Sequence, residues 1–333
     1  MNFKGIIGHR RNIEQIKKLI NDGRLPHAML FCGPEGVGKR MTAVALAAFS
    51  NCEDPRPEGA CGNCMSCIKL KAGSHPLIRF IGSSKDEPVM EVEFRNQDTV
   101  LISNIIPVKE DGSKKETKKI SINQIRDIIR YSSLKAYGAK KKIFIIDDVA
   151  NSSKEALNSL LKILEEPPED TYFMLVTSKE ESLLPTVLSR CSRIVFGSLS
   201  PEDMELFAAG RIPAESGLDA EKTAELLRIS SGIPGRMLSY LNIHDVFFPE
   251  ALPEDFFENV KKWFTDNNEC IEKLNILIQL EGNRFRDDPT VEGCEKIAII
   301  ENTVKSIKEN ANAELAVSNM FIKLGAMKFP GTR

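Results

Sequence analysis

The feature that most constrains the fold is a glycine-rich turn lying directly between an apolar run and a helical pattern. The apolar run is Ala28 to Cys32, and the turn reads Gly33-Pro34-Glu35-Gly36-Val37-Gly38-Lys39-Arg40. A helical pattern then continues to about Phe49. Glycines at positions 33, 36 and 38 allow the backbone to curl so that its N–H groups face one anion, which the helix dipole also attracts. The order strand, turn, helix therefore predicts a phosphate-binding loop, with Lys39 reaching the outer phosphates.

The last residue of this loop departs from the usual pattern. A phosphate loop normally ends in Ser or Thr, whose hydroxyl binds the magnesium ion of the nucleotide. Here Arg40 offers no oxygen ligand and repels a cation, and Thr42 lies two residues further on. Two interpretations stay open: a degenerate site that binds ATP or ADP, with or without Mg²⁺, and hydrolyses little, or a turn retained without nucleotide.

A second buried strand is predicted from Lys142 to Ile146, and two acids follow it in Ile143-Phe144-Ile145-Ile146-Asp147-Asp148. A strand of this kind delivers a magnesium-coordinating carboxylate to a phosphate loop, and Asp147 is the candidate. The next position usually carries Glu, which polarises the attacking water. Asp148 is one methylene shorter, and an offset of about an ångström can cost about 100-fold in rate. The alternative is that both acids cap the turn that follows.

Strands and helices alternate up to about residue 198. Capping residues predict helix starts at Ser121-Ile122-Asn123-Gln124 and at Ser152-Ser153-Lys154-Glu155, and further strands are predicted at Tyr172–Val176 and Arg193–Phe196. This alternation predicts an α/β domain with a parallel sheet over residues 1–198.

Two stretches differ from that alternation. Residues 84–119 hold two apolar pieces, Val89–Phe94 and Val100–Ile106, followed by a lysine-rich run, which predicts a surface hairpin insertion with a solvated tip. From Ser200-Pro201 onward only helical periodicity is found, in one group over 199–243 and a second over 244–333.

Four cysteines are clustered at about residues 50–75, with the spacing C-x8-C-x2-C-x2-C. They are Cys52, Cys61, Cys64 and Cys67. Four thiolates so close together suit a tetrahedral zinc ion, and because all four ligands come from the protein the metal is expected to be structural. The alternatives are unliganded thiols or disulfides. His75 is interpreted as a loop residue before Pro76.

Two arginines are candidates for contact with phosphate. Arg190, in Leu188-Ser189-Arg190-Cys191, lies at the expected edge of the α/β domain, where it can stabilise phosphoryl charge across a subunit boundary as an arginine finger. The alternative is a surface arginine paired with a carboxylate. Arg236 follows Gly232-Ile233-Pro234-Gly235 and either senses a nucleotide between domains or simply begins a helix.

Charge and hydropathy exclude some classes of function. Among 333 residues, 45 Lys and Arg stand against 47 Asp and Glu, a net charge of −2, so no global basic field favours nucleic acid. No apolar run reaches the length of about 18 residues that a membrane span needs, and the first residues lack a signal peptide. We expect a cytoplasmic protein with no membrane partner.

In this order the motifs resemble the bacterial clamp-loader family of AAA+ proteins, and most closely its delta-prime-like members. The resemblance covers about residues 5 to 240. Besides the glycine loop, the cysteine module and Ser189-Arg190-Cys191, it rests on two stretches: Leu25-Pro26-His27-Ala28 and Leu157-Asn158-Ser159-Leu160-Leu161-Lys162-Ile163-Leu164-Glu165-Glu166-Pro167-Pro168.

The resemblance implies an AAA+ P-loop domain with an inserted zinc module, a helical lid domain over 199–243 and a helical C-terminal collar over 244–333. It also implies a place in a hetero-pentameric ring with gamma/tau motor subunits and a delta subunit, which loads a sliding clamp onto primed DNA during replication by DNA polymerase III. Delta-prime-like members are poor ATPases that act as stators, and Arg190 matches the arginine they offer to the adjacent motor.

Two rival functions are weighed against this one. A gamma/tau-type motor subunit would need a hydroxyl residue at position 40 and an Asp-Glu pair at 147–148, and this chain has neither. A zinc-containing protein that reads DNA sequence would need a basic face and base-reading side chains, which the neutral balance of charge disfavours.

Overall fold

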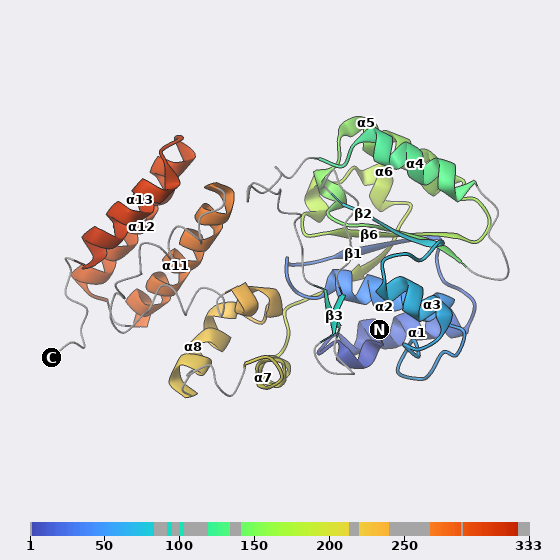
Figure 1. Cartoon of the computed structure of the whole chain (residues 1–333), viewed down its shortest axis with the longest axis horizontal. Coiled ribbons are helices and arrows are strands. Elements are labelled where there is room, and N and C mark those ends of the chain that lie inside the picture. The colour runs from blue at the N-terminus through green and yellow to red at the C-terminus, as the bar shows by residue number, and fades with distance from the viewer. Residues whose placement is uncertain are drawn as a thin grey trace. The chain divides into compact units, whose positions relative to one another are not determined.

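The computed structural model describes residues 2–82, 92–94, 100–102, 119–133, 141–212, 220–239, 267–287 and 289–325. The chain divides into two compact units (Figure 1). The first comprises Met1–Pro107, Lys115–Ser216 and Gly232–Gly235, and the second comprises Val108–Lys114, Gly217–Ser231 and Arg236–Arg333. The domain borders expected near residues 198 and 243 stay predictions.

Five parallel strands form the main sheet of the first unit. They are β1 (Ala28–Cys32), β2 (Ile78–Ile81), β5 (Lys142–Ile146), β6 (Thr171–Thr177) and β7 (Ser192–Val195), in the order β2-β5-β6-β1-β7. This confirms the α/β class. Since β6 pairs in parallel with both β1 and β5, the carboxyl ends of these strands lie at one edge, with Cys32 beside Thr177 and Ile146 beside Leu175. The glycine loop starts at that edge directly after β1, and Asp147 lies there directly after β5.

Helices cover both faces of this sheet (Figure 1). On one face lie α1 (Arg10–Asn21), α2 (Lys39–Asn51) and α3 (Met65–Lys71); on the other lie α4 (Ile122–Ser132), α5 (Lys154–Glu165) and the short α6 (Pro185–Leu188). The 3₁₀ turns are η1 (Phe3–Gly5), η2 (Val149–Asn151) and η3 (Glu180–Ser182), and α7 (Pro201–Ala209) follows the sheet in sequence.

The caps predicted from the sequence are present. The Ser121 hydroxyl accepts from the Gln124 N–H at 3.4 Å, and Gln124 Oε1 accepts from the Ser121 N–H at 2.8 Å, so α4 begins with a complete capping box. Ser153 caps α5 and Ser200 caps α7 in the same side-chain-to-backbone manner. Each such cap contributes about 1 kcal/mol.

The central strands of the sheet are buried on both faces, as is usual in a parallel sheet, whereas the edge strand β7 is partly exposed. Every residue of β1 and β5 is buried. On the α4–α5 face, the buried cluster includes Leu30, Phe144, Phe173, Leu160 and Ile125. Burial of each such side chain stabilises the fold by about 1.5–3 kcal/mol, and the summed effect holds the strand ends in place.

The end of α2 is fixed to the start of β5 by one buried amide. Nδ2 of Asn51 donates to the Lys141 carbonyl at 2.8 Å, and Oδ1 of Asn51 accepts from the Lys141 N–H at 2.9 Å. Asn51 is the last residue before the cysteine module, which therefore begins from a fixed point.

A second, two-stranded sheet lies in the stretch expected to form a hairpin. β3 (Val92–Phe94) and β4 (Val100–Ile102) pair antiparallel, with Glu93 opposite Leu101. The lysine-rich run at 109–115 and the outer parts of both predicted pieces lie outside the described residues.

The second unit is helical in its described part. It contains α8 (Ala220–Ser230), α11 (Asn267–Asp287), α12 (Val291–Lys308) and α13 (Ala313–Gly325). Its core includes Leu226, Leu274, Ile300, Val317 and Met320. The assignment of these helices to a lid and a collar stays a prediction. Among the described residues, no helix combines the length and hydropathy that crossing a bilayer requires.

Candidate functional site

The glycine loop between β1 and α2 has the left-handed backbone that its sequence predicts. Gly33 has φ +142°, and a Cβ atom there would lie 2.1 Å from the carbonyl oxygen of Phe196. Gly38 has φ +109° with open space around its Cα. Only glycine adopts both conformations readily, so the turn depends on these two positions.

Two contacts from distant segments hold the loop. Nε2 of His9 lies 2.9 Å from the carbonyl oxygen of Val37, and the His9 ring packs edge-on against Phe196 at 4.8 Å. The Gly235 N–H donates to the Gly36 carbonyl at 2.9 Å. Sequence reasoning did not identify His9 as part of the site. Its left-handed φ of +54° after Gly8 is a structural signal that the sequence alone does not display.

Lys39 lies in the site but turns back on its own loop. Its side chain is buried, and Nζ donates to the carbonyls of Gly33 at 2.8 Å and Pro34 at 2.6 Å. Burial lowers the pKa of Lys39, while Glu35, Asp147 and other nearby acidic groups oppose the shift. The ammonium therefore lies at the loop and contacts oxygens of the protein itself, and its predicted contact with the outer phosphates stays a prediction.

Arg40 and Asp147 form an ion pair across the site. Nη1 of Arg40 lies 3.1 Å from Oδ2 of Asp147, and both side chains are partly exposed, at 24% and 30%. The residue at the position of the missing hydroxyl thus contacts the carboxylate predicted to hold magnesium. Thr42 does not replace that hydroxyl, because its Oγ1 donates to the Gly38 carbonyl at 3.0 Å within α2.

Asp148 lies at the turn that follows β5. Its backbone is left-handed, with φ +52°, and its carbonyl accepts from the Asn151 N–H at 2.8 Å. Burial raises the pKa of the Asp148 carboxyl, and the charges of Asp147 and Glu35 add to that shift. Asp148 directly precedes η2, and the bond to that turn comes from its backbone carbonyl, so the side-chain capping role left open from the sequence is not seen.

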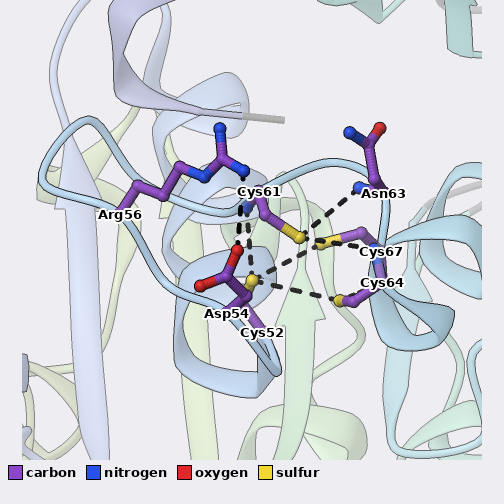
Figure 2. Close-up of polar contacts among 7 residues, drawn as sticks. All are labelled: Cys52, Asp54, Arg56, Cys61, Asn63, Cys64 and Cys67. Atoms are coloured by element: carbon purple, nitrogen blue, oxygen red, sulfur yellow. Dashed lines mark hydrogen bonds and ion pairs between the residues drawn. The ribbon is translucent and has the colours of Figure 1, made fainter.

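The four cysteines of the module converge on one point. Their sulfur atoms all lie within 4.8 Å of one another, with Cys52 Sγ 4.0 Å from Cys64 Sγ and 3.8 Å from Cys67 Sγ. Figure 2 shows them gathered from three places: Cys52 just after α2, Cys61 in the loop, and Cys64 and Cys67 at the start of α3. None of the four is in a disulfide.

Backbone N–H groups point at these sulfur atoms. Cys61 N–H donates to Cys52 Sγ at 3.2 Å, and the N–H groups of Asn63 and Cys64 donate to Cys61 Sγ at 3.4 and 3.3 Å. Although burial raises it, the pKa of Cys61 falls to about 6 because of these N–H donors. N–H groups directed at sulfur stabilise the Cys61 thiolate, whereas burial raises the pKa of Cys52 and of Cys67. The convergence of four sulfur atoms is what fits a thiophilic metal ion.

His75 is not a fifth ligand. Its Nδ1 accepts from the Leu77 N–H at 3.2 Å, and its Nε2 lies 3.0 Å from the Ser66 hydroxyl. Both ring nitrogens thus have protein partners, which confirms the interpretation of His75 as a structural loop residue. The separate thiol of Cys32 is buried and that of Cys191 is partly buried, and burial raises their pKa values to about 11 and about 12.

Arg190 lies two residues after α6, and its side chain is one-third exposed and paired. Its guanidinium donates to Glu165 through Nη2 and to the Thr186 carbonyl through Nη1 at 2.8 Å. The pairing with a carboxylate is the alternative left open from the sequence. Cys191 beside it packs against the buried cluster on the α4–α5 face.

Arg236 belongs to the second unit, whereas the residues before it, Gly232–Gly235, belong to the first. Of the residues predicted for the nucleotide site, Gly33, Gly36, Gly38, Lys39 and Asp147 lie together in the first unit. The role predicted for Arg236 stays a prediction.

Comparisons with known proteins show what this chain is similar to. A family model described as "DNA polymerase III, delta subunit" matches residues 8–200, which is more than half of the chain. Subunit delta' of DNA polymerase III from Pseudomonas aeruginosa is 32% identical over 208 residues, covering 62% of this chain and 53% of that protein. The corresponding subunit of Escherichia coli is 28% identical over 230 residues, covering 69% and 59%.

A gamma/tau subunit of DNA polymerase III from Mycobacterium bovis is also similar, at 28% identity over 243 residues, covering 72% of this chain and 36% of that protein. The chain thus spans between 36% and 59% of the length of these three relatives. In fold, it resembles a gamma subunit-related protein from Thermotoga maritima, with a TM-score of 0.53, 17% identity, and coverage of 94% and 98%. The chain belongs to the DNA polymerase III delta subunit family, with delta-prime subunits among its relatives.

Proposed function

We propose that this chain is a delta-prime-like subunit of the DNA polymerase III clamp loader, a stator that hydrolyses little ATP itself and supplies Arg190 to a neighbouring ATPase site. The observation that carries the proposal is the ion pair between Arg40 and Asp147, at 3.1 Å. It ties up the carboxylate on which magnesium-dependent hydrolysis depends. A motor subunit needs this carboxylate to be free to bind magnesium, because the metal neutralises the charge that develops on the phosphates.

The exposure of Arg190 supports the second half of the proposal. Its side chain is 32% exposed and that of its partner Glu165 is 48% exposed. An exposed ion pair is worth about 0–1 kcal/mol, so a triphosphate presented by an adjacent subunit can compete for the guanidinium. An arginine that reaches a neighbour's phosphate accelerates hydrolysis by about 10³–10⁵-fold.

The partners follow from the proposed role. They are the gamma/tau motor subunits and a delta subunit in a hetero-pentameric ring, with the sliding clamp and primed DNA engaged through the complex. The net charge of −2 supports contact with DNA through the assembly and not through a basic surface of this chain alone.

We further propose that the four-cysteine module holds a structural Zn²⁺. The residues that would hold it are Cys52, Cys61, Cys64 and Cys67, whose sulfur atoms lie close enough to share one ion. Bound there, the metal would cross-link the end of α2 to the start of α3. Because the protein fills all four positions, no open site for substrate is expected.

The experiment that tests the stator role compares two arginine variants in the reconstituted ring. Arg190→Ala should leave assembly intact and reduce DNA-stimulated ATP turnover at the served site by about 10³-fold or more. Arg193→Ala is the matched control, since Arg193 is also exposed and also paired with a carboxylate, that of Glu180. Unchanged ring turnover in Arg190→Ala would show that the finger assignment is wrong.

A gamma/tau-type motor is the second candidate, because the chain keeps Lys39 and all three loop glycines and is 28% identical to a gamma/tau subunit. The isolated chain distinguishes the two. ATP turnover of about 1 s⁻¹ or more by the isolated chain, which is within the range of typical enzyme rates, would favour the motor. Turnover indistinguishable from the protein-free rate would favour the stator.

A further inference from the structure

The nucleotide site of this chain does not fit magnesium. Mg²⁺ demands near-octahedral oxygen ligands at about 2.0–2.1 Å and usually takes them from a loop hydroxyl, a carboxylate, water and phosphate. Here the loop supplies no hydroxyl, because position 40 is Arg and Thr42 is bonded to the Gly38 carbonyl. The carboxylate of Asp147 is bonded to Arg40.

We infer that the Arg40–Asp147 pair closes the phosphate loop to Mg²⁺, and that the loop takes the phosphates of a nucleotide without the metal, with the guanidinium in the place of the cation. This inference rests on the proposed function, since it concerns the same degenerate site. A guanidinium binds phosphate through two parallel N–H donors, which gives it geometric specificity as well as charge. The pair is about one-quarter exposed, so an entering phosphate can reach it.

The charges around the loop set the expected strength of binding. Lys39 and Arg40 contribute two cations, and α2 is a 13-residue helix whose positive end lies at the loop. The negative charges of Glu35, Asp147 and Asp148 act on Lys39 and offset part of this positive charge. The affinity is therefore expected to be modest and to weaken as salt is raised.

The test is a titration of the full-length chain with fluorescent ADP, once in excess EDTA and once in excess MgCl₂. Wild type should bind with dissociation constants that differ less than about 3-fold between the two buffers. Arg40→Thr restores the loop hydroxyl, frees Asp147 for a metal, and should bind at least about 10-fold more tightly with Mg²⁺ than with EDTA. Arg40→Lys keeps the positive charge and should stay insensitive to the metal.

Three results would overturn the inference: Mg²⁺ tightens wild-type binding by about 10-fold or more, Arg40→Thr gains no dependence on Mg²⁺, or wild type binds no nucleotide in EDTA. Circular dichroism and a thermal melt of each variant identify loss of folding as a separate cause. The stator role is tested through Arg190 in the ring, so either hypothesis can fail while the other stands.

Discussion

Arg190, two residues after α6, donates a hydrogen bond to the carboxylate of Glu165, the last residue of α5 and 25 positions earlier in the chain. The Thr186 carbonyl accepts from the other terminal nitrogen of the guanidinium at 2.8 Å. The arginine proposed to serve a neighbouring site is thus held against its own subunit. To reach a phosphate it has to leave this carboxylate.

The first prediction concerns that competition. Glu165→Gln removes the charge that competes with phosphate for Arg190 and keeps the shape of the side chain. Because the pair is partly exposed and worth at most about 1 kcal/mol, ring ATPase should rise by up to about 5-fold. Steady-state ATP turnover of the reconstituted ring measures the effect.

Glu166→Gln is the matched control for this variant, since Glu166 is the next residue and is also exposed. It should leave turnover unchanged. A fall in turnover with Glu165→Gln would show instead that Glu165 positions the arginine for its neighbour.

The second prediction uses the raised pKa of Asp148. An acid whose pKa is raised on folding stabilises the native state only while it is protonated, so its favourable contribution is lost as pH rises through the raised pKa. Asp148→Asn cannot ionise and tolerates the left-handed backbone. It should be more stable than wild type at pH 7, and the gap should close below about pH 4.

Urea unfolding of both proteins at several pH values measures this gap. Asp127→Asn is the control, because Asp127 is exposed on α4 and reports the effect of losing one surface charge. If Asp148→Asn is no more stable than wild type at pH 7, burial of this carboxyl does not penalise its charge.

The third prediction concerns the cysteine module. Cys64 is also the residue that caps α3, where its side chain accepts from the Cys67 N–H. Cys64→Ser keeps a good capping group while removing one thiolate. We expect wild type to carry about one zinc ion per chain and the variant to carry almost none, with faster proteolysis within residues 50–75.

Metal analysis by mass spectrometry and limited proteolysis provide the two measurements. Cys294→Ser, at an exposed free cysteine outside the module, should keep both the metal and the proteolytic pattern. Wild-type protein that is folded and free of zinc would rule out the structural-zinc hypothesis.

The fourth prediction separates two costs of replacing loop glycines. In Gly38→Ala the new Cβ meets open space, so the loss of stability comes only from the backbone φ of +109° and is about 1–3 kcal/mol. Gly33→Ala has a similar backbone strain and in addition places a Cβ 2.1 Å from the Phe196 carbonyl oxygen. It should therefore be less stable than Gly38→Ala by at least about 1 kcal/mol, as measured by chemical denaturation. Equal losses would mean that β7 shifts to relieve the contact.

The sequence was sufficient for elements whose signal is local. β1 and β5 begin and end at the predicted residues, because both are short, wholly buried apolar runs bounded by a turn. The starts of α4 and α5 follow from Ser121 and Ser153, whose hydroxyls bond the first turn of each helix. Here the physical cause lies within a few residues of its effect.

The strand β2 and the helix α3 were missed because their signal is not local. β2 is only four residues long and follows Pro76, and its place beside β5 is set by the sheet. α3 has seven residues and begins at Cys64, a cap that is also a candidate metal ligand, so the cysteine spacing masked the helix. In both cases tertiary context determines the structure.

The site shows the same division. Arg40 and Asp147 were each identified from their motifs, but they are 107 positions apart and their contact depends on the order of strands in the sheet. The contacts of Arg190 with Glu165 and of His9 with Val37 likewise join distant segments. Residue types indicate the chemistry, while the choice of partner depends on topology.

The two hydrogen bonds between Asn51 and the backbone of Lys141 give the thiol-bearing loop an anchored stem. Local unfolding caused by loss of the thiolates should therefore not extend past Asn51. Asn51→Ala, in contrast, would loosen the end of α2 and the residue before β5 together. A chain in which the loop is shortened or lost can therefore keep the same sheet, provided that this one carboxamide is retained.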